Sequence, residues 1–372
     1  KSSSLLLSQT IALFATNVSI YLETVLLSAR FVKVVPMIEL TVVDIFIIVL
    51  WTFVVNRIFR KLFPPHSIIL LYEEYDPTPL LKKVNSRRDR YIIKKSMNVE
   101  EGWEKVTEEI MNYDAVFLCD IHSPLRNRYV KFCYSKGIRS YITPKISDII
   151  IRSSENIHLF DTPLLLSRNQ GFSFEEKFVK RLMDIIIASL ALIITSPIML
   201  IIAAAIKLYD GGPVFFRQDR CTINGKVFSI HKFRSMIENA EKEGEVIPTT
   251  EDDQRITPVG KFIRKTRLDE LPQFIDILKG DMSVVGPRPE RVEHVRQYTA
   301  EIPEFEYRLK VKGGLTGYAQ IYGKYNTSAY DKLKLDLMYI QNYSILLDLK
   351  LIIMTGKIVF MKESTEGFEE KK

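Results

Sequence analysis

The strongest constraint on this chain is an apolar run from Ile185 to Ile206 that contains no charged residue. A helix of that length can span the hydrocarbon core of a bilayer, which needs ~20 mostly apolar residues. Pro197 lies within this run, directly after Ser196. Proline removes one helical hydrogen bond and clashes with the preceding turn, so we expect a sharp bend here. The Ser196 hydroxyl can donate to the backbone carbonyl that the proline leaves without a partner.

Basic residues flank the run on both sides. Lys177, Lys180 and Arg181 precede it, and Lys207 follows it. Positive flanks favour the cytoplasmic side of a membrane, which predicts that both ends lie on one face. We therefore expect a re-entrant helix over residues 180–207, which enters the membrane and returns. A straight span with a mild proline kink is the alternative.

Two further apolar stretches occur near the start of the chain, and we assign residues 1–62 to transmembrane helices. The stretch from 38 to 55 carries one charge, Asp44, and leads into a basic segment at 57–61. The stretch from 5 to 29 is either a helix packed in a membrane bundle or an amphipathic helix. It carries the polar residues Gln9, Asn17 and Glu23. Because the chain begins without Met, we expect that further helices have been lost upstream of Lys1.

Alternating strand and helix patterns begin after residue 66. They predict a small Rossmann-like α/β domain with a parallel sheet over residues 66–166, including one helix over 99–113. The turn after the first strand reads YEEYDPTP. It has no glycine fingerprint, and it places acids where a dinucleotide phosphate would bind. We therefore expect a structural or regulatory domain, which is also a plausible surface for a homodimer.

Charge and cysteine usage narrow the class of partner. The formal net charge of +7 favours an anionic partner: phosphate, nucleic acid or an anionic lipid surface. Cys119, Cys133 and Cys221 are scattered singly, which suits neither a disulfide framework nor a metal site. The histidines are also scattered, so no zinc is expected.

After a linker at 167–174, basic residues gather beside glycine and proline turns. Examples are GGPVFFRQDR, INGKVFSIHKFRSM and KGDMSVVGPRPE. Such loops let side chains and backbone N–H groups converge on phosphate oxygens. Aromatic residues do not alternate with these charges as a nucleic-acid stacking surface requires, so we expect no nucleic-acid partner.

An adjacent acid pair, Asp269 and Glu270, stands out within this basic region. A short helix is predicted over 271–278, ending at Gly280, which places the pair at its N-terminus. Asp269 is then either a simple N-cap or a functional carboxylate. Arg264, Lys265 and Arg267 precede the pair and can attract a phosphate. Neighbouring helical residues point roughly 100° apart, so one carboxylate can attack while the other holds a divalent cation.

Several ordered motifs from Lys180 onward resemble the bacterial sugar transferase family, the monotopic polyprenyl-phosphate phosphoglycosyl transferases. They are KRLMD, the Ser-Pro break, GPVFFRQ, KFRSM, LDELPQ, GDMSVVGPRP and GLTGYAQ. The resemblance implies a membrane α+β protein whose catalytic domain, 172–372, lies at the cytoplasmic face of the bacterial inner membrane. It implies transfer of a sugar phosphate from a UDP-sugar to polyprenyl phosphate in exopolysaccharide, capsule or O-antigen synthesis, with UDP-glucose or UDP-galactose favoured.

The resemblance also implies roles for individual residues. Asp269 would form a covalent aspartyl intermediate, and Glu270 would be the Mg²⁺ ligand. Lys180, Arg181 and Asp184 would belong to the membrane helix with its Ser196–Pro197 break. The expected substrate-binding residues are Lys232, Arg234, Arg264, Arg288, Thr316, Gln320 and Asp336.

Two positions depart from the family pattern. Thr222 stands where the family usually has glycine, and Gly313 where it usually has proline. Both departures predict altered loop stiffness. A catalytically inactive membrane scaffold or nucleotide-sugar sensor is the alternative function.

Overall fold

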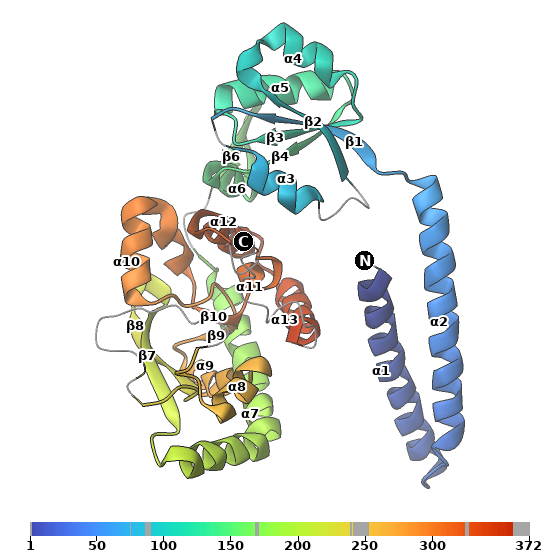
Figure 1. The fold of residues 1–372 in the computed structure, drawn as a ribbon, viewed down its shortest axis with the longest axis vertical. Helices are drawn as coiled ribbons and strands as arrows, with labels where there is room; N and C mark the ends of the chain where they lie inside the picture. The colour runs from blue at the N-terminus through green and yellow to red at the C-terminus, as the bar shows by residue number, and fades with distance from the viewer. Residues whose placement is uncertain are drawn as a thin grey trace. The chain divides into compact units, whose positions relative to one another are not determined.

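The computed structural model describes residues 2–74, 76–85, 91–167, 171–238, 240, 253–323 and 327–359 (Figure 1). The α+β chain divides into two compact units, Lys1–Thr143 and Pro144–Lys372.

The first unit begins with a helical hairpin of α1 (Ser2–Ser28) and α2 (Val35–Leu62). Two polar pairs join the helices. Asn17 donates to the Thr41 hydroxyl at 3.0 Å, and the Thr52 hydroxyl donates to Gln9 Oε1 at 3.1 Å. Gln9 and Asn17 of α1 therefore have partners on α2, as a packed helix requires.

The two helices of the hairpin differ in how well they suit a membrane span. Within α2, Val35–Phe59 is long and apolar enough to cross a membrane. The described apolar part of α1, Ala12–Ser28, is shorter. A transmembrane α1 therefore stays a prediction.

A four-stranded parallel sheet follows, in the order β2-β1-β3-β4. Its strands are β1 (His66–Tyr72), β2 (Tyr91–Asn98), β3 (Ala115–Cys119) and β4 (Arg139–Ile142). The helices of this unit are α3 (Thr78–Asn85), α4 (Trp103–Ile110) and α5 (Ser123–Ser135). The apolar run at 68–71 is fully buried in β1, and the parallel sheet predicted from the alternating pattern is confirmed.

The single helix predicted over 99–113 is wrong. Val99–Glu101 forms a 3₁₀ turn, and α4 begins only at Trp103. Between them, Gly102 has φ = 103°, a left-handed conformation that interrupts the helix and that glycine adopts without strain.

The acid at the end of β1 has a structural partner. Glu73 accepts hydrogen bonds from the backbone N–H of His122 at 2.6 Å and contacts its Nδ1 at 2.8 Å. These residues follow β1 and β3, where open parallel sheets usually bind their ligands. The protein's own carboxylate thus lies where a nucleotide phosphate would be expected.

The second unit holds the remaining elements. Its N-terminal part comprises α6 (Ile146–Arg152), the hairpin β5 (Glu155–Leu159) and β6 (Thr162–Leu166), and the long helix α7 (Phe174–Asp210). Ile146 and Ile149 pack in its core, so α6 belongs with this unit by its contacts. The predicted domain limits at 166 and 172 stay predictions.

The rest of this unit alternates short strands and helices. Its strands are β7 (Phe215–Cys221), β8 (Val227–Phe233), β9 (Ser283–Val285) and β10 (Gly314–Thr316). Its α-helices are α8 (Pro258–Lys265), α9 (Gln273–Lys279), α10 (Val292–Glu301), α11 (Tyr318–Tyr322), α12 (Ala329–Gln341) and α13 (Ile345–Val359). Short 3₁₀ segments are η2 (Ile223–Gly225), η3 (Leu268–Glu270) and η4 (Pro303–Lys310).

Helix α7 has two arms that meet at a sharp bend (Figure 1). Pro197 lies inside the helix, and the Ser196 hydroxyl donates to the Ile193 carbonyl at 2.9 Å. That carbonyl is four residues before the proline, so it is the one that loses its N–H donor. The expected substitute bond from Ser196 is therefore present.

Both arms of α7 pack on the same unit. Ala188 in the first arm belongs to the main core, whereas Ile202 and Ile206 in the second arm pack with Phe233 and Ile263. Around the bend, large apolar side chains are left uncovered: Ile193 is 71%, Ile194 72% and Leu200 71% exposed. The apolar bend thus projects from a unit to which both of its arms are anchored.

Candidate active site

The start of α7 docks this helix onto the rest of the unit. Lys180 forms a buried ion pair with Asp348 of α13 at 2.6 Å. Arg181 donates to the carbonyls of Ile277 and Leu278 at the end of α9, at 2.6 and 2.7 Å. Such a cation at a helix C-terminus also complements the helix dipole.

Asp184 completes this docking. It accepts from the Ser283 hydroxyl at 3.0 Å and the Val284 N–H at 2.9 Å in β9. Lys180, Arg181 and Asp184 were assigned to the membrane helix from the sequence. In the structure they lie within α7 and fix its first arm to α9, α13 and β9.

Lys180→Met is expected to destabilise the protein by about 3–5 kcal/mol, because it leaves the Asp348 carboxylate buried without its cation. The double variant Lys180→Met/Asp348→Leu is expected to recover most of that loss. Thermal unfolding of the three proteins in detergent micelles measures both effects. Unchanged melting of the single variant would show that the ion pair does not hold α7.

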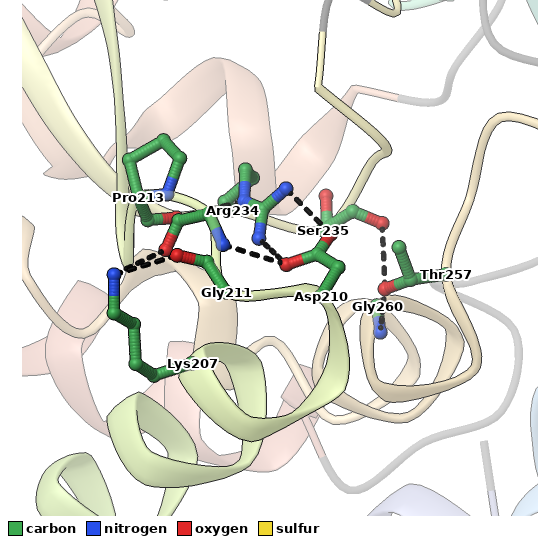
Figure 2. Close-up of polar contacts among 9 residues, drawn as sticks. Lys207, Asp210, Gly211, Pro213, Arg234, Ser235, Thr257 and Gly260 are labelled. Atoms are coloured by element: carbon green, nitrogen blue, oxygen red, sulfur yellow. Dashed lines mark hydrogen bonds and ion pairs between the residues drawn. The ribbon is translucent and has the colours of Figure 1, made fainter.

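The other end of α7 is tied to β8 by Arg234 (Figure 2). The Arg234 guanidinium pairs with the Asp210 carboxylate, with Nη1 to Oδ2 at 2.8 Å, and Nε donates to the Pro213 carbonyl at 2.7 Å. Lys207 Nζ donates to the Gly211 carbonyl at 2.6 Å and so covers the end of the helix. Arg234, predicted to bind substrate, is engaged here rather than beside Asp269 and Glu270.

Figure 2 also shows how α8 approaches this junction. The Gly260 N–H donates to the Thr257 hydroxyl at 2.9 Å, and the Thr257 N–H donates to the Ser235 carbonyl at 3.1 Å. A Cβ at Gly260 would lie 1.9 Å from that carbonyl oxygen, so only glycine permits this approach. The close contact sets the position of α8, which carries Arg264.

The carboxylate pair lies in the turn η3, among cations from other elements. Glu270 Oε1 accepts from Lys232 Nζ of β8 at 3.0 Å and from the Arg288 guanidinium after β9. Burial alone would raise the pKa of Glu270, but the charges of Arg288 and Lys232 outweigh it and hold that pKa well below its usual value. Glu270 is therefore ionised at neutral pH.

Asp269 behaves differently from its neighbour. Burial, together with the charge of Glu270, raises the pKa of Asp269 above its usual value. The nearby charges of Lys232, Arg264 and Arg288 act in the opposite direction. Two adjacent carboxylates with pKa values displaced in opposite senses are typical of sites that assign them different roles.

The helix predicted over 271–278 is present as α9, but its N-terminus lies two residues later than predicted. Helix α9 begins at Gln273 with Pro272 as its N-cap residue, and Asp269 makes no capping bond to it. Arg267, at φ = 56°, separates η3 from α8. Glu270 is held by the side-chain cations Lys232 and Arg288, and the predicted stop at Gly280 is confirmed by its φ of 92°.

The other predicted substrate residues divide into two groups: some have polar atoms without a partner among the described residues, and others are bonded to protein side chains. The charge of Arg264 acts on Asp269, and its Nη1 is buried without a partner among the described residues. The Gln320 side-chain amide likewise has no partner among them. In contrast, Thr316 bonds to Thr355 at 2.6 Å, and Asp336 forms a buried ion pair with Arg308 at 2.8 Å.

Two buried contacts were not anticipated from the sequence. Asp276 of α9 accepts from the His231 N–H at 2.9 Å and contacts its Nδ1 at 2.6 Å. These two contacts fix β8 against α9 at His231, the residue before Lys232. Arg308 donates to the Arg288 carbonyl at 2.9 Å and so braces the segment that carries Arg288. An acid within the otherwise apolar stretch FIDIL was the available signal for Asp276.

The two departures from the family pattern meet in one contact. The Thr222 hydroxyl accepts from the Gly313 N–H at 3.1 Å and donates to the Asp281 carbonyl at 2.9 Å. Proline at 313 would have no N–H to donate. Thr222 and Gly313 therefore tie their two loops together directly.

Fold and site together define an α+β unit that bears a carboxylate pair among cations and a bent apolar helix. Residues 175–362 match the family described as "Bacterial sugar transferase". The chain belongs to the bacterial sugar transferase family.

The names of several relatives state sugar-phosphate transfer to undecaprenyl phosphate as their activity. The chain is 48% identical over 215 residues to the UDP-glucose:undecaprenyl-phosphate glucose-1-phosphate transferase of Klebsiella pneumoniae, covering 56% of this chain and 44% of that protein. It is 45% identical over 185 residues to the UDP-N-acetylgalactosamine-undecaprenyl-phosphate N-acetylgalactosaminephosphotransferase of Aeromonas hydrophila, covering 49% and 44%. It is 31% identical over 270 residues to the undecaprenyl-phosphate galactose phosphotransferase of Salmonella typhimurium, covering 68% and 55%. The chain spans about half the length of these relatives.

Proposed function

We propose that this chain carries the catalytic part of a transferase that moves a sugar-1-phosphate from a UDP-sugar to undecaprenyl phosphate and releases UMP. Such a step would begin the synthesis of an exopolysaccharide, capsule or O-antigen. The observation that carries the proposal is the half-buried Asp269 beside the ion-paired Glu270, within a family whose named relatives transfer sugar phosphates.

In the first half-reaction, a carboxylate oxygen of Asp269 attacks the phosphorus that bears the sugar. The bond from that phosphorus to the bridging oxygen breaks, and UMP leaves with the electron pair. Asp269 attacks in its ionised form and needs no general base. Lys232, Arg264 and Arg288 offset the repulsion between the carboxylate and the diphosphate.

In the second half-reaction, a phosphate oxygen of the lipid attacks the same phosphorus. The bond to Asp269 breaks, which regenerates the carboxylate and yields the lipid-linked diphosphate sugar. Dividing the transfer in this way makes the reaction ping-pong. One phosphoanhydride replaces another overall.

The donor set suits Mg²⁺ held jointly with a substrate. No group of three His, Cys, Asp or Glu side chains within the described residues is placed to hold a metal. Mg²⁺ is commonly bound by one or two carboxylates, with substrate phosphates and water completing its shell. Glu270, ionised next to Asp269, is the proposed ligand. When bound, Mg²⁺ would neutralise charge on the diphosphate.

Glu270→Gln is expected to shift the acid limb of the first half-reaction to lower pH, because it removes the negative charge that helps to raise the pKa of Asp269. Below that pKa the nucleophile is protonated and the rate falls. The variant should also lose about 1.5–3 kcal/mol of transition-state stabilisation, the range for a charged hydrogen bond.

The measurement is a pH profile of UMP release, repeated over a magnesium titration. Glu293→Gln on the exposed face of α10 is the matched control. An unchanged magnesium titration in Glu270→Gln would rule out the ligand role. An unmoved acid limb would rule out the coupling to Asp269.

The sugar is proposed to be glucose or galactose. The names of relatives from Klebsiella and Salmonella include these two sugars, whereas the Aeromonas relative names N-acetylgalactosamine. UMP release from a panel of UDP-sugars with undecaprenyl phosphate tests both the sugar and the activity. A catalytically inactive scaffold would bind a UDP-sugar but release no UMP from any member of the panel.

The membrane arrangement is proposed from the two long apolar helices. Helix α2 would span the membrane, and α7 would enter and return, because both its arms pack on one unit and its bend is uncovered and apolar. The catalytic unit, residues 172–372, would then lie at the cytoplasmic face of the inner membrane. The α/β sheet unit, without a glycine fingerprint, is proposed as a structural or dimerisation domain.

A further inference from the structure

A small cavity opens beside the carboxylate pair. Its lining includes three cations, Arg220, Lys232 and Arg288, together with Gln273 and Gly314. Lys232 and Arg288 are both paired with Glu270. Neither Arg220 nor Gln273 was singled out from the sequence.

Arg220 has no carboxylate partner within the described part of the chain. Its Nη1 donates to the Pro289 carbonyl at 3.2 Å, its Nη2 donates to Gln218 Oε1, and its Nε is buried without a partner there. Burial lowers the pKa of Arg220 to about 10, and the charges of Arg288 and Arg291 act in the same direction, against those of Glu290 and Glu270. A shielded guanidinium among like charges is stabilised by an anion.

Gln273 offers a second, independent sign of a ligand. It is 1% exposed, and its Nε2 has no partner among the described residues. Buried donors in proteins are nearly always bonded, so one without a protein partner in a cavity wall indicates a missing acceptor. Gln273 lies at the first position of α9, three residues after Glu270, the last residue of the turn that carries the acid pair.

We propose that Arg220 and Gln273 bind a phosphate group in this cavity, next to Lys232 and Arg288. This inference rests on the proposed function for its choice of substrates. The phosphate comes either from the diphosphate of the UDP-sugar or from the phosphate monoester of the lipid acceptor. Arginine and amide N–H groups suit both, because each donates to phosphate oxygens.

The two sources are separated by the two half-reactions, followed by intact mass on the full chain in detergent micelles. The first arm measures adduct formation from UDP-glucose alone. The second measures loss of the preformed adduct after undecaprenyl phosphate is added. Arg220→Gln is expected to slow one arm about tenfold or more, the loss that corresponds to one charged hydrogen bond. The arm that slows identifies the source of the phosphate.

Gln273→Leu separates a ligand role from a structural one. Because the Nε2 donor of the amide has no partner among the described residues, an apolar side chain of similar size should leave the melting temperature unchanged or higher. The same variant should slow the same arm as Arg220→Gln. Arg296→Gln, an exposed cation of α10 outside the family motifs, is the matched control and should change neither arm. If both site variants stay within twofold of the control in both arms, the proposal is overturned.

A third readout does not depend on turnover. Inorganic pyrophosphate should raise the melting temperature of the wild-type protein, and Gln273→Leu should reduce that shift. If the wild type forms no adduct with any UDP-sugar but keeps a Gln273-dependent shift, the proposed function fails while the phosphate site stands. If the shift is equal in wild type and Gln273→Leu, the site assignment fails.

Discussion

Asp269→Asn is expected to lower turnover by at least about a thousandfold, the scale of loss when a covalent nucleophile is removed. The amide keeps the shape of the carboxylate but does not attack phosphorus. Incubation of the wild-type protein with a UDP-sugar alone should leave one sugar-phosphate adduct on the chain, and the variant should show none. Intact mass after rapid quenching measures this directly.

The variant is also expected to fold. Burial raises the pKa of Asp269, which means that the surroundings disfavour its charge, so a neutral amide should not lower the melting temperature. Asp281→Asn, an acid that pairs with Lys226 outside the site, is the control and should keep turnover. Turnover retained in Asp269→Asn, or a wild type without adduct, would contradict the covalent mechanism.

Ser196→Ala/Pro197→Leu is expected to straighten α7 and to abolish most activity. The change restores an N–H four residues after Ile193 and removes the ring that bends the helix. A straight α7 cannot keep both arms on one unit, where Ile202 and Ile206 now pack with Phe233 and Ile263. In a membrane, some molecules should then adopt a full span.

Cysteine labelling from each side of membrane vesicles tests this topology. The sites are Lys177 and Leu208, because both are exposed, whereas Lys180 is buried in its ion pair. Both positions should label from the cytoplasmic side in the wild-type background and from opposite sides in part of the double variant. Ile193→Leu/Ile194→Leu, which keeps the proline, is the control. Labelling from opposite sides in the wild-type background would exclude the re-entrant arrangement.

Both of these predictions could be formulated from the sequence, because their causes are local. The missing N–H of Pro197 acts on the carbonyl four residues earlier whatever surrounds the helix, and Ser196 bonds to it as expected. The parallel sheet also follows from local patterns of apolar residues. The helix expected over 99–113 failed for a local reason too, because the left-handed Gly102 breaks it.

The partners of the carboxylate pair were only partly predictable. Lys232 and Arg288 were singled out and both reach Glu270. Arg234, two residues after Lys232, should share its face in a continuing strand. Strand β8 ends at Phe233, however, and Arg234 turns to Asp210. Lys232 and Arg234 belong to the same motif, so the motif alone did not show which of them reaches the acid pair and which anchors a helix.

By itself, the sequence determined the bent apolar helix, the parallel sheet and the family, and it made Asp269 and Glu270 the candidate acid pair. These depend on proline chemistry, on residue periodicity and on motifs that are short along the chain. Tertiary structure decided which groups meet: Arg220 and Gln273 in one cavity, and Thr222 with Gly313 across 91 residues. Such pairs form only where the ends of strands and turns bring distant residues together. The packing of the whole unit sets where those ends lie, and the neighbouring residues along the chain do not.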